Sequence, residues 1–113
     1  MSLLPKQGTL LRIFIPETEQ YKGKNLYEAI VYKAQELGLA GATVFKGIMG
    51  YQAGHQIQTS KILRLSENMP IVIEIIDTEN NINKILPFLD EAVTDGLITT
   101  EKATIYKAVN SKN

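Results

Sequence analysis

Residues 71–76, Ile-Val-Ile-Glu-Ile-Ile, decide the fold. Nearly all of them are β-branched, which is typical of a β-strand. Successive side chains of a strand point to opposite faces, so three isoleucines share one face, while Val72, Glu74 and Ile76 share the other. The stretch therefore predicts a strand that is largely apolar on both faces.

Three further stretches predict strands around this one. Apolar residues alternate over residues 9–15, and Pro16 ends the pattern because proline cannot donate to a sheet ladder. Residues 42–48 are rich in β-branched and aromatic side chains, and residues 97–107 predict a last strand or strand pair. Residues 47–60 contain three glycines and are predicted to form a long loop.

Two helices are predicted between the strands. Apolar residues recur at helical spacing over residues 26–37, with Asn25 as the expected N-cap. Gly38 should end this helix, because glycine adopts the left-handed conformation at low cost. A second helical stripe follows the candidate caps Asp77 and Thr78, and Pro87 inside it should kink or restart the helix.

The order β-α-β-β-α-β is that of the split β-α-β, ferredoxin-like arrangement. We therefore expect an α+β fold with a four-stranded antiparallel sheet and two helices on one face. A single domain should span residues 1–113, with flexible tails at residues 1–8 and 110–113. Apolar residues on the second face of the sheet predict that an oligomer buries it. A partly exposed face, or one covered by the tail, is the alternative.

The composition excludes several classes of protein. Twelve Lys and Arg balance twelve Asp and Glu in 113 residues, which argues against broad nucleic-acid binding. The absence of cysteine excludes disulfides, thiol nucleophiles and cysteine zinc sites, and it favours a reducing cytoplasm. No apolar run reaches the ~18–20 residues of a membrane span.

The chain is not expected to be an enzyme, because its sequence lacks the usual combinations of catalytic residues. The chain has one histidine, His55, and no serine in a nucleophile-elbow pattern. The carboxylate pairs Glu17/Glu19 and Asp90/Glu91 are interpreted as solvated surface charges. No metal site is expected, because His55 has no second histidine or cysteine as a co-ligand. A metal held jointly by His55 of several subunits is the alternative.

The predicted long loop lies in a window without carboxylates, which extends from Glu36 to Glu67. This window holds Lys46, Lys61 and Arg64, together with glycines and hydroxyl side chains. Backbone amides, hydroxyls and positive charge are the groups that bind an anion. The window therefore predicts a local anion site, and a solvated loop with ordinary surface lysines is the alternative.

Four motifs resemble the nitrogen-regulatory PII signalling proteins. They are GLAGATV at residues 38–44, Lys46-Gly47, GYQAGH at residues 50–55 and PIVIEI at residues 70–75. A similarity to the PII-like domain-of-unknown-function family 190 covers nearly the whole chain. Its motifs are LRIFI at 11–15, YEAI at 27–30, GATV at 41–44, GIMG at 47–50, KILRLS at 61–66 and Leu86-Pro87.

The PII resemblance implies a compact homotrimer that binds an adenine nucleotide in the clefts between subunits. Thr43, Gly50 and Gln52 match positions at the base of that effector site, and Lys102 matches the phosphate-contacting lysine. The resemblance also implies that the long loop touches a target protein.

The chain departs from the PII pattern in several places. The PII family has a glycine-rich phosphate loop before its last strand, whereas residues 96–102 here carry Thr99 and Glu101 at glycine positions. The C-terminal arginine pair of the PII family is absent, and the last arginine is Arg64.

We therefore expect a non-enzymatic, PII-like regulatory protein that binds a small anion or nucleotide between subunits. The expected ligand residues are Thr43, Lys46, Gly50, Gln52, Lys61, Arg64 and Lys102. The loop would then change its contacts with a partner protein through Tyr51, His55 and Gln56. The alternative is a ligand-independent interaction or assembly module associated with a membrane channel or transporter, since some family-190 members are encoded beside fluoride channels.

Overall fold

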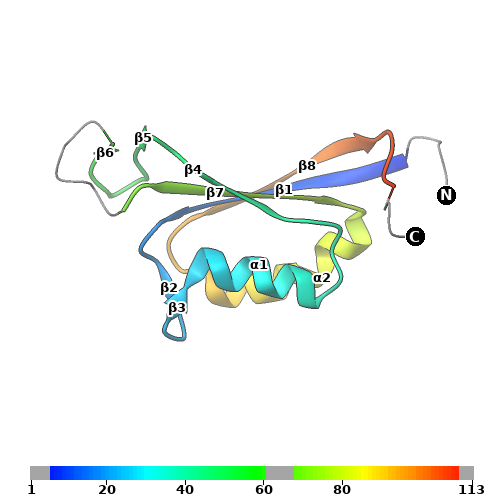
Figure 1. The fold of residues 1–113 in the computed structure, drawn as a ribbon, viewed down its shortest axis with the longest axis horizontal. Coiled ribbons are helices and arrows are strands. Elements are labelled where there is room, and N and C mark those ends of the chain that lie inside the picture. Colours follow the sequence, from blue (N-terminus) through cyan, green and yellow to red (C-terminus); the bar gives the residue numbers. More distant parts are fainter. Residues whose placement is uncertain (1–5, 61–67, 110–113) are drawn as a thin grey trace.

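The centre of the fold is a four-stranded antiparallel sheet with the strand order β4-β7-β1-β8 (Figure 1). The computed structural model describes residues 6–60 and 68–109. The sheet strands are β1 (Lys6–Pro16), β4 (Thr43–Lys46), β7 (Pro70–Asp77) and β8 (Leu97–Ile105). Helices α1 (Leu26–Glu36) and α2 (Glu79–Ala92) lie on one face of the sheet (Figure 1). The predicted ferredoxin-like α+β fold is confirmed.

The hydrophobic core fills the space between the sheet and the two helices. Ile13 on β1 and Ile73 on β7 are cross-strand partners at its centre, and both are fully buried. From the helix side, α1 contributes Ile30, and α2 contributes Ile85 and Leu89. Burial of one such side chain stabilises the fold by roughly 1.5–3 kcal/mol. The apolar pattern thus decides which face of the sheet the helices cover.

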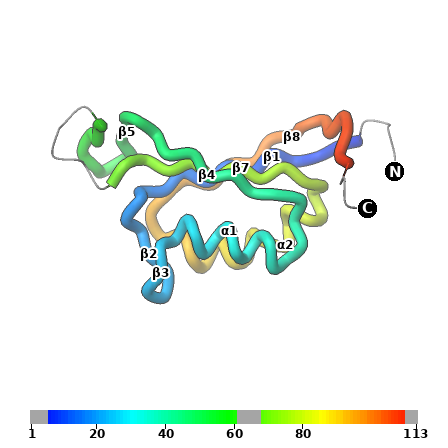
Figure 2. The backbone as a smooth tube through the Cα atoms, viewed as in Figure 1, coloured from blue at the N-terminus to red at the C-terminus, as the bar shows by residue number. Residues whose placement is uncertain are grey.

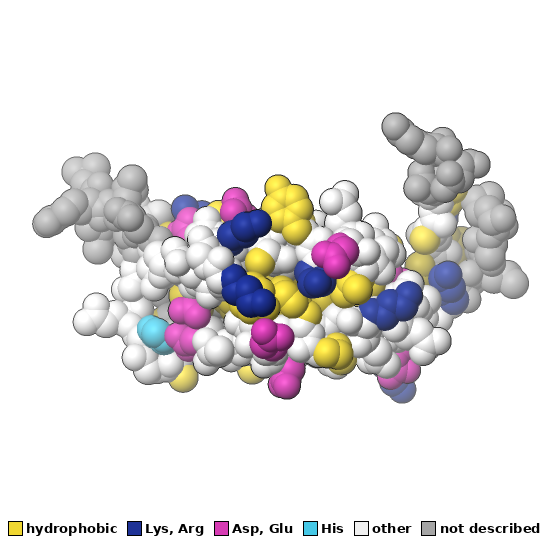
Figure 3. All heavy atoms as spheres, turned by 90° about the horizontal axis from the view of Figure 1, so that it is seen from below, with side chains coloured by type: hydrophobic (Ala, Val, Ile, Leu, Met, Phe, Trp, Pro, Cys, Tyr) yellow, Lys and Arg dark blue, Asp and Glu magenta, His cyan; other side chains and the backbone are white. Residues whose placement is uncertain are grey.

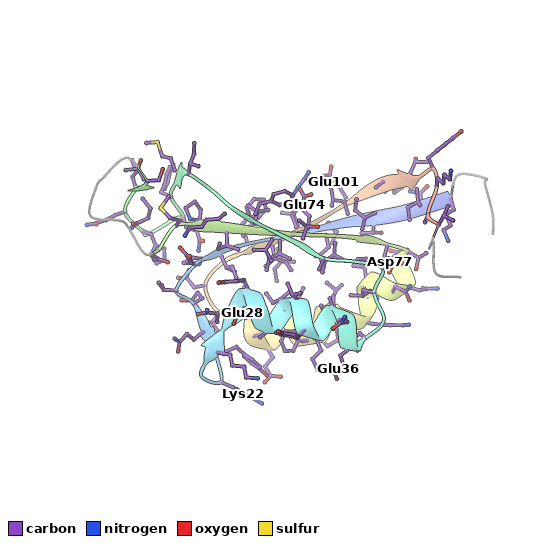
Figure 4. All side chains as sticks on the ribbon, in the orientation of Figure 1. Lys22, Glu28, Glu36, Glu74, Asp77 and Glu101 are labelled. Carbon is purple, nitrogen blue, oxygen red and sulfur yellow. The ribbon has the colours of Figure 1, made fainter. Side chains whose placement is uncertain are left out.

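The opposite face of the sheet, called here the open face, carries no helix (Figure 1). Strand alternation and register place a group of apolar side chains on it, which includes Leu10, Phe14, Phe45, Val72, Ile76 and Leu97. Phe45, Ile76 and Leu97 are between 47% and 56% exposed. Figure 4 shows Glu74 and Glu101 on this same side of the sheet. The open face is therefore an apolar surface with a charged centre.

The first helix begins at Leu26 after Asn25 and ends before Gly38, as predicted, but its N-cap lacks the expected side-chain hydrogen bond. Asn25 occupies the N-cap position without a side-chain hydrogen bond, and its backbone pairs with Gln20 in a short hairpin of β2 (Gln20–Tyr21) and β3 (Lys24–Asn25). The Leu26 N–H instead donates to the Glu19 carbonyl at 2.8 Å. Gly38 follows the helix with a φ of 79°, in the left-handed region, as predicted.

The second helix begins at a predicted cap. The Thr78 hydroxyl accepts a hydrogen bond from the Asn81 N–H at 3.3 Å. The helix continues through Pro87 without restarting, contrary to one of the two predicted outcomes. Ile85 and Leu89 flank the proline and are fully buried, so core packing holds both halves of the helix in place.

The strand boundaries also differ from the predicted ones. Residues 6–8, expected in a tail, belong to β1, because β8 extends far enough to pair Lys6 with Ile105. The predicted loop over residues 47–60 contains a second hairpin of β5 (Met49–Gly50) and β6 (Gln58–Thr59). The start of β1 and the end of β8 lie at one end of the sheet, and β5 lies at the other (Figure 2). In the described part of the chain, no helix is long and apolar enough to span a membrane.

Candidate functional site

Residues 47–60, called here the arm, fold back on the end of the sheet. The Gly47 N–H donates to the Pro70 carbonyl at 2.8 Å, and the Ser60 N–H donates to the Ile48 carbonyl at 3.0 Å. Gly50 lies against the Pro70 ring, where an added Cβ would come within 3.2 Å of Cγ. At Gly47 the same distance would be 2.9 Å. These glycines therefore let the arm pack closely on β7.

The tip of the arm is held by a carboxylate from the other half of the chain. Asp95, in the segment between α2 and β8, accepts a hydrogen bond from the Gln52 side-chain amide at 3.1 Å. Its second oxygen lies 2.8 Å from Nε2 of His55. The His55 N–H also donates to the Gln52 carbonyl at 2.8 Å, which closes a turn. Gln52, His55 and Asp95 form one group, called here the Asp95 cluster.

A pocket lies between the arm and the end of the sheet. Its apolar wall comes from Phe14, Pro16, Pro70 and Val72. Its polar wall comes from Gln52, His55, Gln56, Gln58 and Asn68. None of the described residues that line it carries a carboxylate, an ammonium or a guanidinium group. Amides that donate and accept beside an apolar wall suit a flat heterocyclic group better than a phosphate.

The structure brings together five of the predicted site residues. Gly50 and Gln52 from the predicted ligand set line the pocket with Tyr51, His55 and Gln56 from the predicted partner set. Tyr51 is 73% exposed, so only part of it faces the pocket. The two sets predicted as separate are thus one structural unit, because the hairpin folds the loop back on itself.

The remaining predicted ligand residues lie elsewhere. Thr43 is exposed on the open face, and Lys46 forms an ion pair with Glu17 at 3.0 Å. Lys102 on β8 pairs with Thr9 on β1, and β4 and β8 are the two outer strands of the sheet. Thr43 and Lys102 therefore do not meet within one chain. Lys61 and Arg64 lie outside the described residues.

The region that matches the PII phosphate loop is not a loop here. From Leu97 onward these residues belong to β8, and Glu101 accepts a hydrogen bond from Nη1 of Arg12 at 2.6 Å. Nε of Arg12 also donates to Glu74 at 2.8 Å, across the pairing of β1 with β7. The hydrogen bond to Glu74, followed by that to Glu101, raises the pKa of Arg12 against the opposing effect of burial. Glu101 is thus part of the charged group with Arg12 and Glu74 on the open face.

Asp77 is a structural carboxylate at the opposite end of the sheet from the arm. It accepts hydrogen bonds from the Ala40 N–H at 2.9 Å, the Thr78 N–H at 2.7 Å and the Asn81 side chain at 3.0 Å. Burial by itself would raise the pKa of Asp77, but these hydrogen bonds and the charge of Lys6 together lower it. Asp77 therefore joins β7, α2 and the α1–β4 connection.

Asp95 is the site residue that the sequence analysis missed. In the sequence it is one of several acidic residues near the end of the second helix, with no motif around it. Its partners are 43 and 40 residues away along the chain, so only the tertiary structure reveals the contact. Across residues 6–60 and 68–109, no three His, Cys, Asp or Glu side chains gather as a group that could hold a metal ion.

Residues 8–105 match the DUF190 family (Uncharacterized ACR, COG1993). A UPF0166 protein of Aquifex aeolicus (strain VF5) is 42% identical over 98 residues, which cover 85% of this chain and 90% of that protein. The UPF0166 protein MJ1524 of Methanocaldococcus jannaschii is 38% identical over 102 residues, which cover 89% of this chain and 94% of that protein.

Solved structures with a similar fold include PII-like proteins. CPII from Thiomonas intermedia K12, bound to ADP, AMP and bicarbonate, superposes with a TM-score of 0.66 at 14% identity and covers 94% of each chain. A putative PII-like signaling protein from Thermus thermophilus, TTHA0516, superposes with a TM-score of 0.63 at 17% identity. That alignment covers 90% of this chain and 92% of the other. The fold is therefore PII-like.

Proposed function

The chain belongs to the DUF190 family, and from this membership and its PII-like fold we propose that it is a non-enzymatic regulatory protein. Its effector is an adenine nucleotide, and its output is a change in the contacts that the arm makes with a partner protein. The observation that carries the proposal is the pocket under the arm, in which Gly50 and Gln52 lie beside an apolar wall. The similar CPII structures contain ADP and AMP.

The adenine base is the part of the effector that the pocket suits. Gln52 and Gln56 can donate to ring nitrogens and accept from an exocyclic amine, while Phe14 and Pro70 supply an apolar surface for the ring. The phosphates need cations, and the lining contains none among the described residues. Lys46 near the arm and Lys102 on the far strand are the candidates.

A symmetric homo-oligomer, which we propose to be a trimer, supplies the second of these cations. Because β4 and β8 are the outer strands, Thr43 of one subunit can approach Lys102 only of a neighbouring subunit. The open face gives a reason for such an assembly, since Phe45, Ile76 and Leu97 remain about half exposed in the single chain. The effector then lies between subunits.

Regulation follows from competition at Gln52. In the structure the Gln52 amide is bound to the Asp95 carboxylate, and that charge also disfavours an anion nearby. A nucleotide that takes the Gln52 amide must therefore bind better to an arm released from Asp95 than to the arm as observed. Such a difference in affinity between two states is what an effector needs to shift their populations.

The test is a calorimetric titration of the protein with ATP, ADP and AMP, together with Gln52→Ala and a matched Gln35→Ala variant on the exposed side of α1. At least one nucleotide should bind and raise the melting temperature, and Gln52→Ala should weaken that binding by about tenfold, about 1.4 kcal/mol. Gln35→Ala should bind like the unchanged protein. The proposal fails if no adenine nucleotide binds, or if the two variants behave alike.

A second candidate function is favoured by the outer surface of the arm. Ile48, Met49, Tyr51 and Ile57 are between 59% and 77% exposed there, which is unusual for a short hairpin without a partner. This surface suits a ligand-independent interaction module that binds an apolar partner such as a membrane transporter. Retention of a co-purified partner that is unchanged by ATP, ADP or AMP would favour this function over the first.

A further inference from the structure

A groove on the outer surface of the helix layer lies between α1, α2 and the β2–β3 hairpin. It lies on the other side of the sheet from the open face, so an oligomer built through that face leaves it accessible. Figure 3 shows this side of the molecule, where hydrophobic side chains gather over the helices among Lys, Arg, Asp and Glu side chains. We propose that the groove binds an acidic segment of a partner protein, in which apolar or aromatic residues are flanked by Asp and Glu.

The floor of the groove is aromatic. Tyr21 from β2 and Phe88 from α2 form an edge-to-face pair with ring centroids 5.2 Å apart and an interplanar angle of 74°. Ala29 and Pro87 extend this surface, and Tyr32 on α1 is 69% exposed beside it. Exposed aromatic side chains give large contact area at a small entropic cost, which is why they are enriched in interfaces. The floor thus suits an apolar anchor.

Three lysines border this floor. Nζ of Lys22 lies 5.3 Å from the centroid of Tyr21, and Nζ of Lys33 lies 5.3 Å from the centroid of Phe88. Lys24 follows Lys22 across a tight turn, in which Lys22 and Gly23 have φ values of 50° and 82°. Two positive φ values are typical of the type I′ turns that close short hairpins. The turn therefore holds two lysines at one end of the groove (Figure 4 labels Lys22).

The carboxylates of the groove already have partners within the chain. Glu91 accepts a hydrogen bond from the Tyr21 hydroxyl at 3.1 Å, and Glu36 pairs with Lys33 at 3.4 Å. Lys22 and Lys24, by contrast, form no ion pair with any described residue. Glu91 keeps its charge beside Tyr21, because a phenol is neutral. The lining, with three lysines and two glutamates, therefore carries one net positive charge, which comes from Lys22 and Lys24 at the hairpin end. A ligand that complements it carries carboxylates beside its apolar anchor.

A peptide fits these features better than a nucleic acid does. A continuous polyanion would lie along Glu91 as well as the lysines, and like charges in contact weaken binding. An acidic peptide can place its carboxylates at Lys22 and Lys24 and its apolar side chains over Tyr21 and Phe88. The zero net charge of the chain also gives no general attraction for nucleic acid.

The experiment is a titration of the ¹⁵N-labelled protein with the fluorescein-labelled peptide Asp-Glu-Asp-Phe-Leu-Phe-Asp-Glu-Asp, up to about 1 mM. The Asn/Gln version of the peptide is the neutral control, and oligouridine RNA is the polyanion control. Amide shifts should move at Lys22, Gly23, Lys24 and Tyr32, and raising the salt concentration should weaken binding.

Two matched pairs of variants locate the binding. Lys24→Glu should weaken it about tenfold, whereas Lys107→Glu, an equal charge reversal beyond β8, should change it less than about twofold. Tyr32→Ala should weaken it about fivefold, whereas Tyr106→Ala, at a tyrosine with 72% exposure, should leave it unchanged. The proposal is overturned if the hairpin amides do not move, if the neutral peptide or the RNA binds equally well, or if either control matches its test variant.

Discussion

Replacement of Asp95 by alanine tests how the arm is held. The change removes both hydrogen bonds at the tip, from the Gln52 amide at 3.1 Å and from His55 at 2.8 Å, and leaves the hairpin pairing of β5 with β6 intact. The arm should therefore open more often, while the core, to which Asp95 does not belong, stays folded.

The size of the effect follows from the exposure of the groups. A net intramolecular hydrogen bond contributes about 0.5–1.5 kcal/mol, and the lower half of that range applies here because the Asp95 and His55 side chains are 37% and 41% exposed. Two such bonds give about 1–2 kcal/mol, which corresponds to about a 5- to 30-fold larger opening constant. Global stability should change by less than the opening of the arm does.

Hydrogen–deuterium exchange measures this directly. The amides of His55 and Ser60, whose hydrogen bonds both lie within the arm, should exchange about 5- to 30-fold faster in Asp95→Ala, while those of β7 should not change. Asp90→Ala, which removes an exposed carboxylate on α2, is the matched control and should leave the arm unaffected. Exchange of the arm within about twofold of the unchanged protein, or an equal rise in the control, would refute the assigned role of Asp95.

The same variant connects the arm to the proposed effector. If a nucleotide competes with Asp95 for the Gln52 amide, the released arm should bind it more tightly, because the cost of breaking the Asp95 contacts is gone. Weaker nucleotide binding in Asp95→Ala would contradict the competition, even if the exchange result stands.

Two further predictions concern the sheet. Asp77→Asn should lower the free energy of unfolding by about 1–3 kcal/mol at neutral pH. The asparagine side chain lacks the negative charge that three donors stabilise, or it turns its own NH₂ donor toward the Ala40 N–H. Because the pKa of Asp77 is lowered in the fold, its charge stabilises the fold above the pKa of the unfolded chain and loses that effect as the pH falls through the folded pKa. In urea unfolding, the difference in free energy of unfolding between the unchanged protein and Asp77→Asn should therefore shrink in acid. An equal difference at every pH would contradict this. Phe45→Glu, at a side chain 49% exposed on the open face, should convert the proposed homo-oligomer to a monomer, as measured by sedimentation velocity, with little loss of monomer stability. Tyr106→Glu should leave the oligomer unchanged. An unchanged oligomer in Phe45→Glu would rule out the open face as the interface.

Most of the secondary structure could be predicted from the sequence, because the patterns that indicate it involve neighbouring residues. Alternation over residues 71–76 and the glycine after the first helix depend on a few neighbouring residues, and both are as predicted in the structure. Where a distant segment competes, the local signal fails. Asn25 is at the N-cap but makes no side-chain cap within the hairpin that pairs it with Gln20. Pro87 does not interrupt a helix that buried Ile85 and Leu89 hold on both sides.

For the candidate site, the sequence predicted which types of residue take part but not which of them are in contact. The sequence by itself determined the glycine- and glutamine-rich arm and the apolar second face of the sheet, since each depends on composition or on strand alternation. The tertiary structure alone decided that Asp95 holds Gln52 and His55, and that Thr43 and Lys102 lie on opposite edges. Such contacts join residues far apart along the chain, and no local pattern records which distant side chain the folded sheet brings near.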